Sequence, residues 1–203
     1  FSIYRQPTGV VFVYIVGGTV LFESSPLPVP YYVPVLSHSA GTVTIRGNVS
    51  CTEEFNLSAT AIVEVVQLIQ LQVYVCVQTG GTIRGLGYTF SVQVWTWLDG
   101  IFIDAGFSRF LGDLYLSGPA LKRITARRFY SHQNVYVTSS AAVQLFSGAS
   151  WQVISTGVVY LQNDAVFMNA DLSAGTQIVV DGRLIKTVGL LNVFWIHVIL
   201  QPT

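Results

Sequence analysis

Charged side chains are scarce in this chain of 203 residues: they make up 10% of the sequence, whereas hydrophobic residues make up 51%. This composition excludes a disordered chain, which requires low hydrophobicity and high net charge. The ten basic and ten acidic residues cancel, and this balance argues against direct nucleic-acid binding, for which a basic excess is typical. Because so few charges are left to cover the surface, we expect apolar faces that associate with other protein.

Residue patterns that carry out chemistry are also absent. The three histidines, His38, His132 and His197, have no second ligand at metal-binding spacing. Neither a Gly-x-Ser-x-Gly elbow nor a phosphate-binding loop occurs in the sequence. We therefore predict a non-enzymatic protein with no catalytic residue, no cofactor and no metal. The two cysteines, Cys51 and Cys76, fit either one disulfide or two buried free thiols.

Two stretches without charge, residues 6–22 and 65–83, come close to the length of about 20 residues that a membrane-spanning helix needs. The first contains proline and glycines, the second contains glutamines, and both are rich in β-branched residues. These compositions favour strands over helices. We therefore predict no membrane span.

Strand patterns and turn residues are abundant. Three two-residue sequences, Gly17-Gly18, Asp99-Gly100 and Asp181-Gly182, separate strand-like segments and are typical of β-hairpin turns. The long apolar run over residues 59–77 alternates with period 2, which predicts a strand with a bend or break near residues 66–68; a helix is the alternative. Residues 120–129 fit a short helix or one more strand.

These signals predict an all-β fold, an antiparallel β-sandwich of the jelly-roll type with about 10–12 strands. Nothing in the composition divides the chain, so residues 1–203 are predicted to form a single jelly-roll domain. Within it, residues 1–36 fit an N-terminal hairpin followed by an extended, Pro-rich connection.

Two groups of residues are candidates for contact with a partner. Lys122, Arg123, Arg127 and Arg128 bring four of the ten basic residues together beside aromatic residues. They fit an anion or partner site, with a solvated face or intersubunit salt bridges as the alternative. Trp95 and Trp97 share one face of a predicted strand. They fit a glycan platform or a subunit interface, or two rings in the core.

The last third of the chain contains three segments in a distinctive order. An Ala174-Gly175 turn precedes the alternating run of residues 176–180, and the aromatic-rich run of residues 192–200 follows. This order resembles the closing strands of trimeric jelly-roll domains of the complement-head and tumour-necrosis-factor type. Similar jelly rolls form viral capsid, spike and head-fibre subunits. Thr176 stands where those families usually have an acidic residue. The resemblance implies a homotrimeric or shell-forming module without a catalytic site.

We therefore expect a structural subunit that self-assembles through uncharged β-rich faces, above all a virion protein such as a capsid, spike or fibre head. Its partners would be copies of itself in a trimer or shell, other virion proteins, or a host receptor. The alternative is a secreted trimeric binding module or lectin that recognises a receptor or a glycan, and would be located outside the cell. A glycan-cleaving enzyme on a β-sandwich is the third reading.

Overall fold

The computed structural model describes residues 2–3, 12–23, 30–138, 142–162, 164, 166–187, 193–195 and 197–200. These residues form strands joined by turns, and no helix occurs among them. In particular, the described ranges hold no helix long and apolar enough to cross a membrane. The all-β prediction is confirmed, and the helix alternatives for residues 59–77 and 120–129 are wrong.

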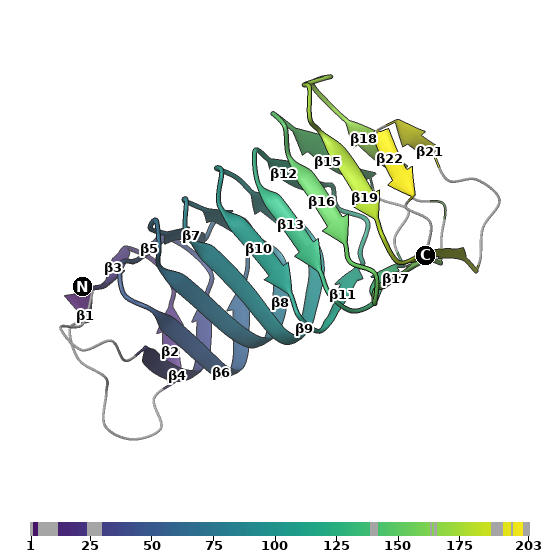
Figure 1. Ribbon diagram of the computed structural model, residues 1–203. Coiled ribbons are helices and arrows are strands. Elements are labelled where there is room, and N and C mark those ends of the chain that lie inside the picture. The colour runs from purple at the N-terminus through teal and green to yellow at the C-terminus, as the bar shows by residue number, and fades with distance from the viewer. Residues whose placement is uncertain are drawn as a thin grey trace.

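All strand pairings in the described chain are parallel. Val20 lies beside Val43, which lies beside Val63, so each strand pairs with the segment about 20 residues further along. The chain therefore winds as a coil whose turns stack along one axis (Figure 1). This architecture is a parallel β-solenoid of about 8 turns.

Each complete turn contributes one strand segment to each of three sheets, which we call face 1, face 2 and face 3. Four strands are long enough to bend across a corner and so belong to more than one face: β4 (Tyr31–His38), β6 (Val49–Leu57), β8 (Gln70–Arg84) and β9 (Tyr88–Phe102). Strands β4 and β6 each have one segment in face 1 and one in face 2, whereas β8 and β9 each have a segment in all three faces.

The shorter strands complete the faces. Face 1 also contains β10 (Phe107–Phe110), β13 (Arg128–Ser131), β16 (Ser150–Val153), β19 (Gln177–Val180) and β22 (His197–Leu200). Face 2 also contains β2 (Phe12–Ile15), β11 (Asp113–Leu116), β14 (Val135–Val137), β17 (Val158–Leu161) and β20 (Arg183–Lys186). Face 3 also contains β1 (Ser2–Ile3), β3 (Thr19–Phe22), β5 (Thr42–Ile45), β7 (Ile62–Val65), β12 (Lys122–Thr125), β15 (Ala142–Phe146), β18 (Val166–Asn169) and β21 (Val193–Trp195).

The hydrophobic core fills the inside of the coil. Side chains alternate between the inside and the surface along each strand, and parallel in-register pairing places each inward residue on its counterpart one turn away. On face 2 one such column contains Phe55, Cys76, Trp95, Leu114 and Val135, all buried. The abundance of apolar residues is thus accounted for largely by a core that runs the length of the coil.

The three turns predicted to be hairpins are corners of the coil. Gly17-Gly18 joins β2 on face 2 to β3 on face 3, Asp99-Gly100 lies within β9, and Asp181-Gly182 joins β19 on face 1 to β20 on face 2. At each of them the chain bends into the next face and does not reverse onto its own preceding strand. The predicted antiparallel β-sandwich of the jelly-roll type is therefore wrong, as is the estimate of 10–12 strands.

Two local expectations can be compared with the structure. The break predicted near residues 66–68 is confirmed, because β7 ends at Val65, β8 begins at Gln70, and Leu68 between them has a φ of 65°. Pro34 lies within β4, where the register shifts as the strand passes from face 1 to face 2. A residue without an N–H fits such a corner. Residues 24–29 of the Pro-rich connection lie outside the described residues.

Candidate binding surface

The predicted basic cluster does not form one site. Lys122 and Arg127 are buried inside the coil, with 1% and 0% of their surface exposed, whereas Arg123 and Arg128 are exposed. Strand alternation separates them: Arg123 and Arg128 occupy outward positions on faces 3 and 1, and Lys122 occupies an inward position. Only half of the cluster is therefore available to an anion or a partner.

The two buried cations bind backbone carbonyl groups. The Lys122 ammonium donates hydrogen bonds to the carbonyl oxygens of Leu98 and Ala120, both at 3.1 Å, and of Gly118 at 3.4 Å. Burial lowers the pKa of Lys122 to about 8, although Asp99 acts in the opposite direction. Lys122 thus holds together carbonyl groups at the corner between faces 2 and 3.

Arg127 has the same structural role at the corner between faces 3 and 1. Burial lowers its pKa to about 10. Its guanidinium donates to atoms from the two preceding turns: Ser108 Oγ at 2.8 Å, Gly85 O at 3.0 Å, Ile103 O at 3.2 Å, Phe107 O at 3.2 Å, Thr89 Oγ1 at 3.3 Å and Gly87 O at 3.4 Å. A Cβ on Gly106 would lie 2.7 Å from Arg127 Nη1, so this glycine makes room for the side chain.

Trp95 and Trp97 lie in the core, each with 0% of its surface exposed. The Trp97 ring meets the Phe102 ring edge-on at a centroid distance of 5.0 Å, and Trp95 packs against Phe110 at 5.6 Å. Neither indole reaches the surface, so neither can contact a glycan or a second subunit. Of the interpretations of this pair, the structure shows the packed core.

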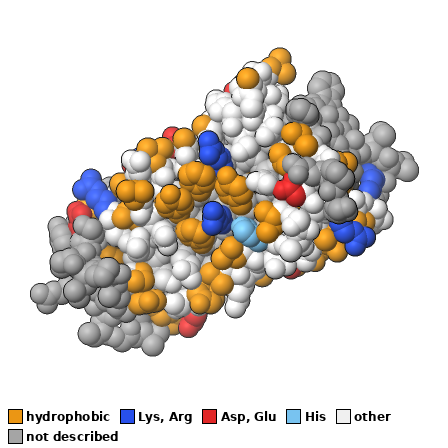
Figure 2. Space-filling model, in the orientation of Figure 1, with side chains coloured by type: hydrophobic (Ala, Val, Ile, Leu, Met, Phe, Trp, Pro, Cys, Tyr) orange, Lys and Arg blue, Asp and Glu red, His pale blue; other side chains and the backbone are white. Residues whose placement is uncertain are grey.

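A different set of side chains gathers on the outside of face 1. They occupy the outward positions of three neighbouring strands, β9, β10 and β13, where each strand supplies two residues. We call this set the Arg–aromatic grid: Tyr88, Phe90, Phe107, Arg109, Arg128 and Tyr130. Figure 2 shows basic side chains surrounded by hydrophobic ones on the side of the molecule that carries these strands in Figure 1.

The grid has two columns along the coil axis. In one, Tyr88 stacks on Phe107 at 5.5 Å with an interplanar angle of 17°, and the Arg128 guanidinium lies 5.5 Å from the centroid of Phe107. In the other, Arg109 lies 5.7 Å from the centroid of the Tyr130 ring. Both distances fall within the range of cation–π contacts, which hold a guanidinium in place without neutralising it.

The charged side chains of the Arg–aromatic grid are all positive. Ion pairs among the described residues involve other cations, in Arg46–Glu23, Arg84–Glu64 and Lys186–Asp164, and neither Arg109 nor Arg128 forms one. On the face 1 segments of β9, β10, β13, β16 and β19, the outward positions contain no acidic residue. The exposed Glu53 and Glu54 lie on β6, where it bends from face 1 into face 2. His132, just after β13, has a pKa lowered by burial and by the nearby charge of Arg109. The grid therefore presents uncompensated positive charge.

Face 2 has its own aromatic ladder, and the cation–π contacts of the described residues involve other rings. Tyr115 stacks on Tyr136 at 4.7 Å with an angle of 12°, and Tyr136 stacks on Tyr160 at 5.0 Å with an angle of 7°. Burial and the charge of Asp113 raise the pKa of Tyr136. This ladder presents hydroxyl groups and ring edges on a second face of the same coil.

Several carboxylates hold the corners of the coil. Four aspartates accept a hydrogen bond from a backbone N–H at a corner: Asp99 from Gly100, Asp104 from Gly85, Asp113 from Asn134 and Asp171 from Ser147. Within the described ranges, no group of three His, Cys, Asp or Glu side chains could hold a metal ion. The cysteines are free and buried, and burial raises the pKa of Cys51 to about 11.

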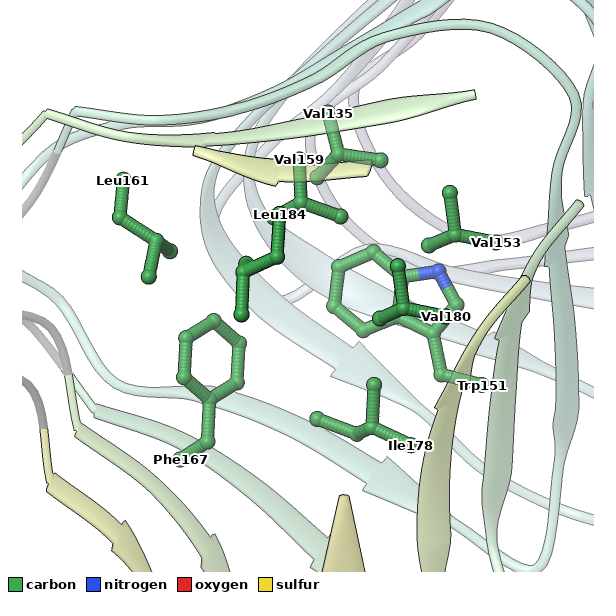
Figure 3. Close-up of a pocket in the computed structure, with 9 residues that line it drawn as sticks. All are labelled: Val135, Trp151, Val153, Val159, Leu161, Phe167, Ile178, Val180 and Leu184. Carbon is green, nitrogen blue, oxygen red and sulfur yellow. The ribbon is translucent and has the colours of Figure 1, made fainter. Parts of the chain in front are cut away.

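A small cavity of about 20 Å³ lies inside the coil among its later turns (Figure 3). Its lining is entirely apolar, from Val135, Trp151, Val153, Val159, Leu161, Phe167, Ile178, Val180 and Leu184. The labelled side chains converge on one another, as in a packed core. The lining offers no polar group that could orient a ligand.

The fold and this surface define a parallel β-solenoid with an outward-facing grid of exposed arginines and half-buried aromatic rings. No family model, no curated protein and no solved structure matches the chain.

Sequence reasoning identified Arg128 but missed the other five residues of the grid. The signal was the recurrence of outward residue pairs separated by two positions: Tyr88 with Phe90, Phe107 with Arg109, and Arg128 with Tyr130. These pairs lie about 20 residues apart, which is one turn of the coil. Unless the number of residues per turn is known, the sequence does not show that these pairs are neighbours in space.

Proposed function

We propose that the protein is a non-enzymatic binding module whose face 1 binds a polysaccharide. Of the roles expected from the sequence, this corresponds to the extracellular module that recognises a glycan. The observation that carries the proposal is the Arg–aromatic grid, in which aromatic and guanidinium side chains repeat on adjacent strands of a continuous sheet.

The regular spacing of the strands favours a polymeric ligand. Parallel strands lie about 4.8 Å apart, so the outward side chains of face 1 form rows at constant steps along the coil. A polysaccharide is also a periodic chain, and it can make similar contacts at successive steps. Gln70 and Gln72 continue the two columns on β8, and their amides can both donate to and accept from sugar hydroxyl groups.

Retention on immobilised polysaccharides tests this function. The purified chain is applied to heparin, polygalacturonate and dextran resins at low salt, next to an uncoated resin. We expect retention on at least one polysaccharide resin, with release by the same polysaccharide in solution. A folded chain that is retained on none of them contradicts the proposed function.

Self-association is a second candidate, and a separate observation favours it. Large apolar side chains are exposed on the first described turns, with Phe12 at 53%, Tyr14 at 68% and Val16 at 82%. Such side chains can be covered by a second copy.

Light scattering coupled to size exclusion tests this self-association. We expect an assembly whose mass falls when Tyr14 and Val16 are both changed to Ser; a monomer at micromolar concentration contradicts the self-association. The trimer and the virion setting stay predictions from the sequence.

A further inference from the structure

We propose that the Arg–aromatic grid selects an acidic polysaccharide, whose carboxylate or sulfate groups accept hydrogen bonds from Arg109 and Arg128. This inference rests on the proposed function and adds the chemical class of the ligand.

The two guanidinium groups are arranged in advance for such a ligand. Each lies over a ring of the neighbouring strand, Arg109 over Tyr130 and Arg128 over Phe107. This stacking limits the rotamers of long side chains, so less conformational entropy is lost on binding. It also leaves the N–H edges of the guanidinium free, and these edges match the two oxygens of a carboxylate or sulfate.

The two guanidinium groups have no negatively charged partner among the described residues. Neither arginine forms an ion pair among the described residues, and the acid at the neighbouring edge of face 1, Asp181, accepts a hydrogen bond from Gln152 at 2.6 Å. An anionic ligand would supply the missing partner.

The positions of the arginines suit a linear polyanion. Arg109 and Arg128 lie on adjacent strands and in different columns, so they are diagonal neighbours. Strand spacing and rise place such residues about 8 Å apart. A chain laid across β10 and β13 can therefore bring two of its acidic groups to the two guanidinium groups.

The same geometry argues against a nucleic acid. Single-stranded nucleic acids bind proteins by stacking their bases on exposed ring faces. Here the faces of Tyr88, Phe107 and Tyr130 are turned toward one another, with interplanar angles of 17° and 18°, or are covered by a guanidinium. At these three rings a base finds mainly ring edges, whereas a carboxylate or sulfate finds the N–H donors of the two guanidinium groups.

The test compares two double variants with the same change in net charge. The first is Arg109→Gln with Arg128→Gln; the control is Arg123→Gln with Arg183→Gln, two exposed arginines on faces 3 and 2. Affinities for heparin, polygalacturonate and dextran are measured by titration, with single-stranded DNA and polyglutamate as competing classes. Circular dichroism and the midpoint of urea unfolding show that both variants are folded.

We expect the grid variant to bind the acidic polysaccharides at least about tenfold more weakly than the wild type, while the control stays within about twofold. Binding by the wild type should weaken as salt is added, because salt screens exposed charges. Heparin and polygalacturonate separate sulfate from carboxylate preference. A third variant, Phe107→Leu, retains the charge but removes the ring beneath Arg128, and should give an intermediate loss.

Each other outcome overturns the inference in a distinct way. Equal losses in the two double variants would show general charge attraction, and tighter binding of DNA or polyglutamate would identify another class of ligand. Binding of dextran that survives the grid substitutions would leave the proposed function standing without this inference. Absence of binding to any polysaccharide would remove both.

Discussion

The buried cations show how single side chains stabilise the coil. Backbone carbonyl groups at a corner point away from the strand ladders, and a buried carbonyl without a partner is destabilising. Lys122 and Arg127 reach such carbonyls from inside the coil. Their burial is tolerated because the hydrogen bonds that their N–H groups would make to water are replaced by hydrogen bonds to protein acceptors.

Arg127→Met is expected to lower the free energy of unfolding by about 3–5 kcal/mol, which is typical when one partner of a buried charged network is lost. The substitution leaves four carbonyl oxygens of the preceding turns without this donor. Urea unfolding followed by circular dichroism measures the loss. Arg123→Met, at an exposed position four residues earlier, is the control and should stay within about 0.5 kcal/mol; similar losses in both would contradict this role of Arg127.

Lys122 should make stability depend on pH in the alkaline range. Its pKa is about 8 in the folded chain and 10.5 in the reference state, so between these values the unfolded state binds more protons and stability rises with pH. We expect the free energy of unfolding of the wild type to gain on the order of 1 kcal/mol relative to Lys122→Met between pH 8 and 9.5, after allowance for solvent screening. Urea midpoints at several pH values give this difference, and a constant difference would contradict it.

At the scale of the elements, the corners decide the fold. Each strand segment is only a few residues long, and the chain must turn into the next face without leaving buried polar groups unpaired. Asp99 illustrates the solution: its carboxylate accepts a hydrogen bond from the N–H of Gly100 at 2.6 Å, and Gly100 has a φ of 112°. Glycine adopts such a positive φ without the strain that a side chain would cause, so it allows the chain to bend sharply at this corner.

Gly100→Ala is expected to lower the free energy of unfolding by about 2 kcal/mol or more, because it combines strained φ with a steric clash. A Cβ at this position would lie 2.6 Å from Gly80 O and 2.7 Å from Gly81 O, on the preceding turn. Gly17→Ala is the matched control, since Gly17 has open space around its Cβ position and no positive φ. Thermal unfolding compares the two, and an equally stable Gly100→Ala protein would contradict the steric argument.

At the scale of the whole molecule, the strands of each turn of the coil pair only with those of the turns next to it, although a long side chain such as Arg127 reaches two turns back. Stability in such a fold is approximately a sum of local terms, so damage at one turn should stay near it. This differs from a sandwich, in which one core is shared by all strands. The elongated coil also gives face 1 its length, and with it the row of outward side chains proposed to bind a polymer (Figure 1).

Leu114→Ala tests this local behaviour. Leu114 is buried on β11 between Trp95 and Val135 of the adjacent turns, and truncation of a buried leucine costs about 2–5 kcal/mol. Hydrogen exchange is expected to speed up most in β9, β11 and β14, with smaller changes in β4 and β19. A uniform loss of protection along the chain would show that the coil unfolds as one unit.

The class of secondary structure followed from the sequence alone. Period-2 alternation and β-branched residues predict strands wherever they occur, as at residues 59–77, because each strand must bury one face. The break near Leu68 was also predictable. Among the candidate residues, Arg128 is exposed on the proposed binding surface, and its ring partner Phe107 could not be found because it lies one turn away in sequence.

The direction of pairing was decided only by the tertiary structure. A two-residue turn such as Asp181-Gly182 can reverse the chain or bend it into the next face, and the alternation of side chains is the same in both cases. The outcome depends on which distant segment each strand meets, and here the partner lies one full turn along the chain. That same choice buries Trp95, Trp97, Lys122 and Arg127 and brings Arg109 beside Arg128.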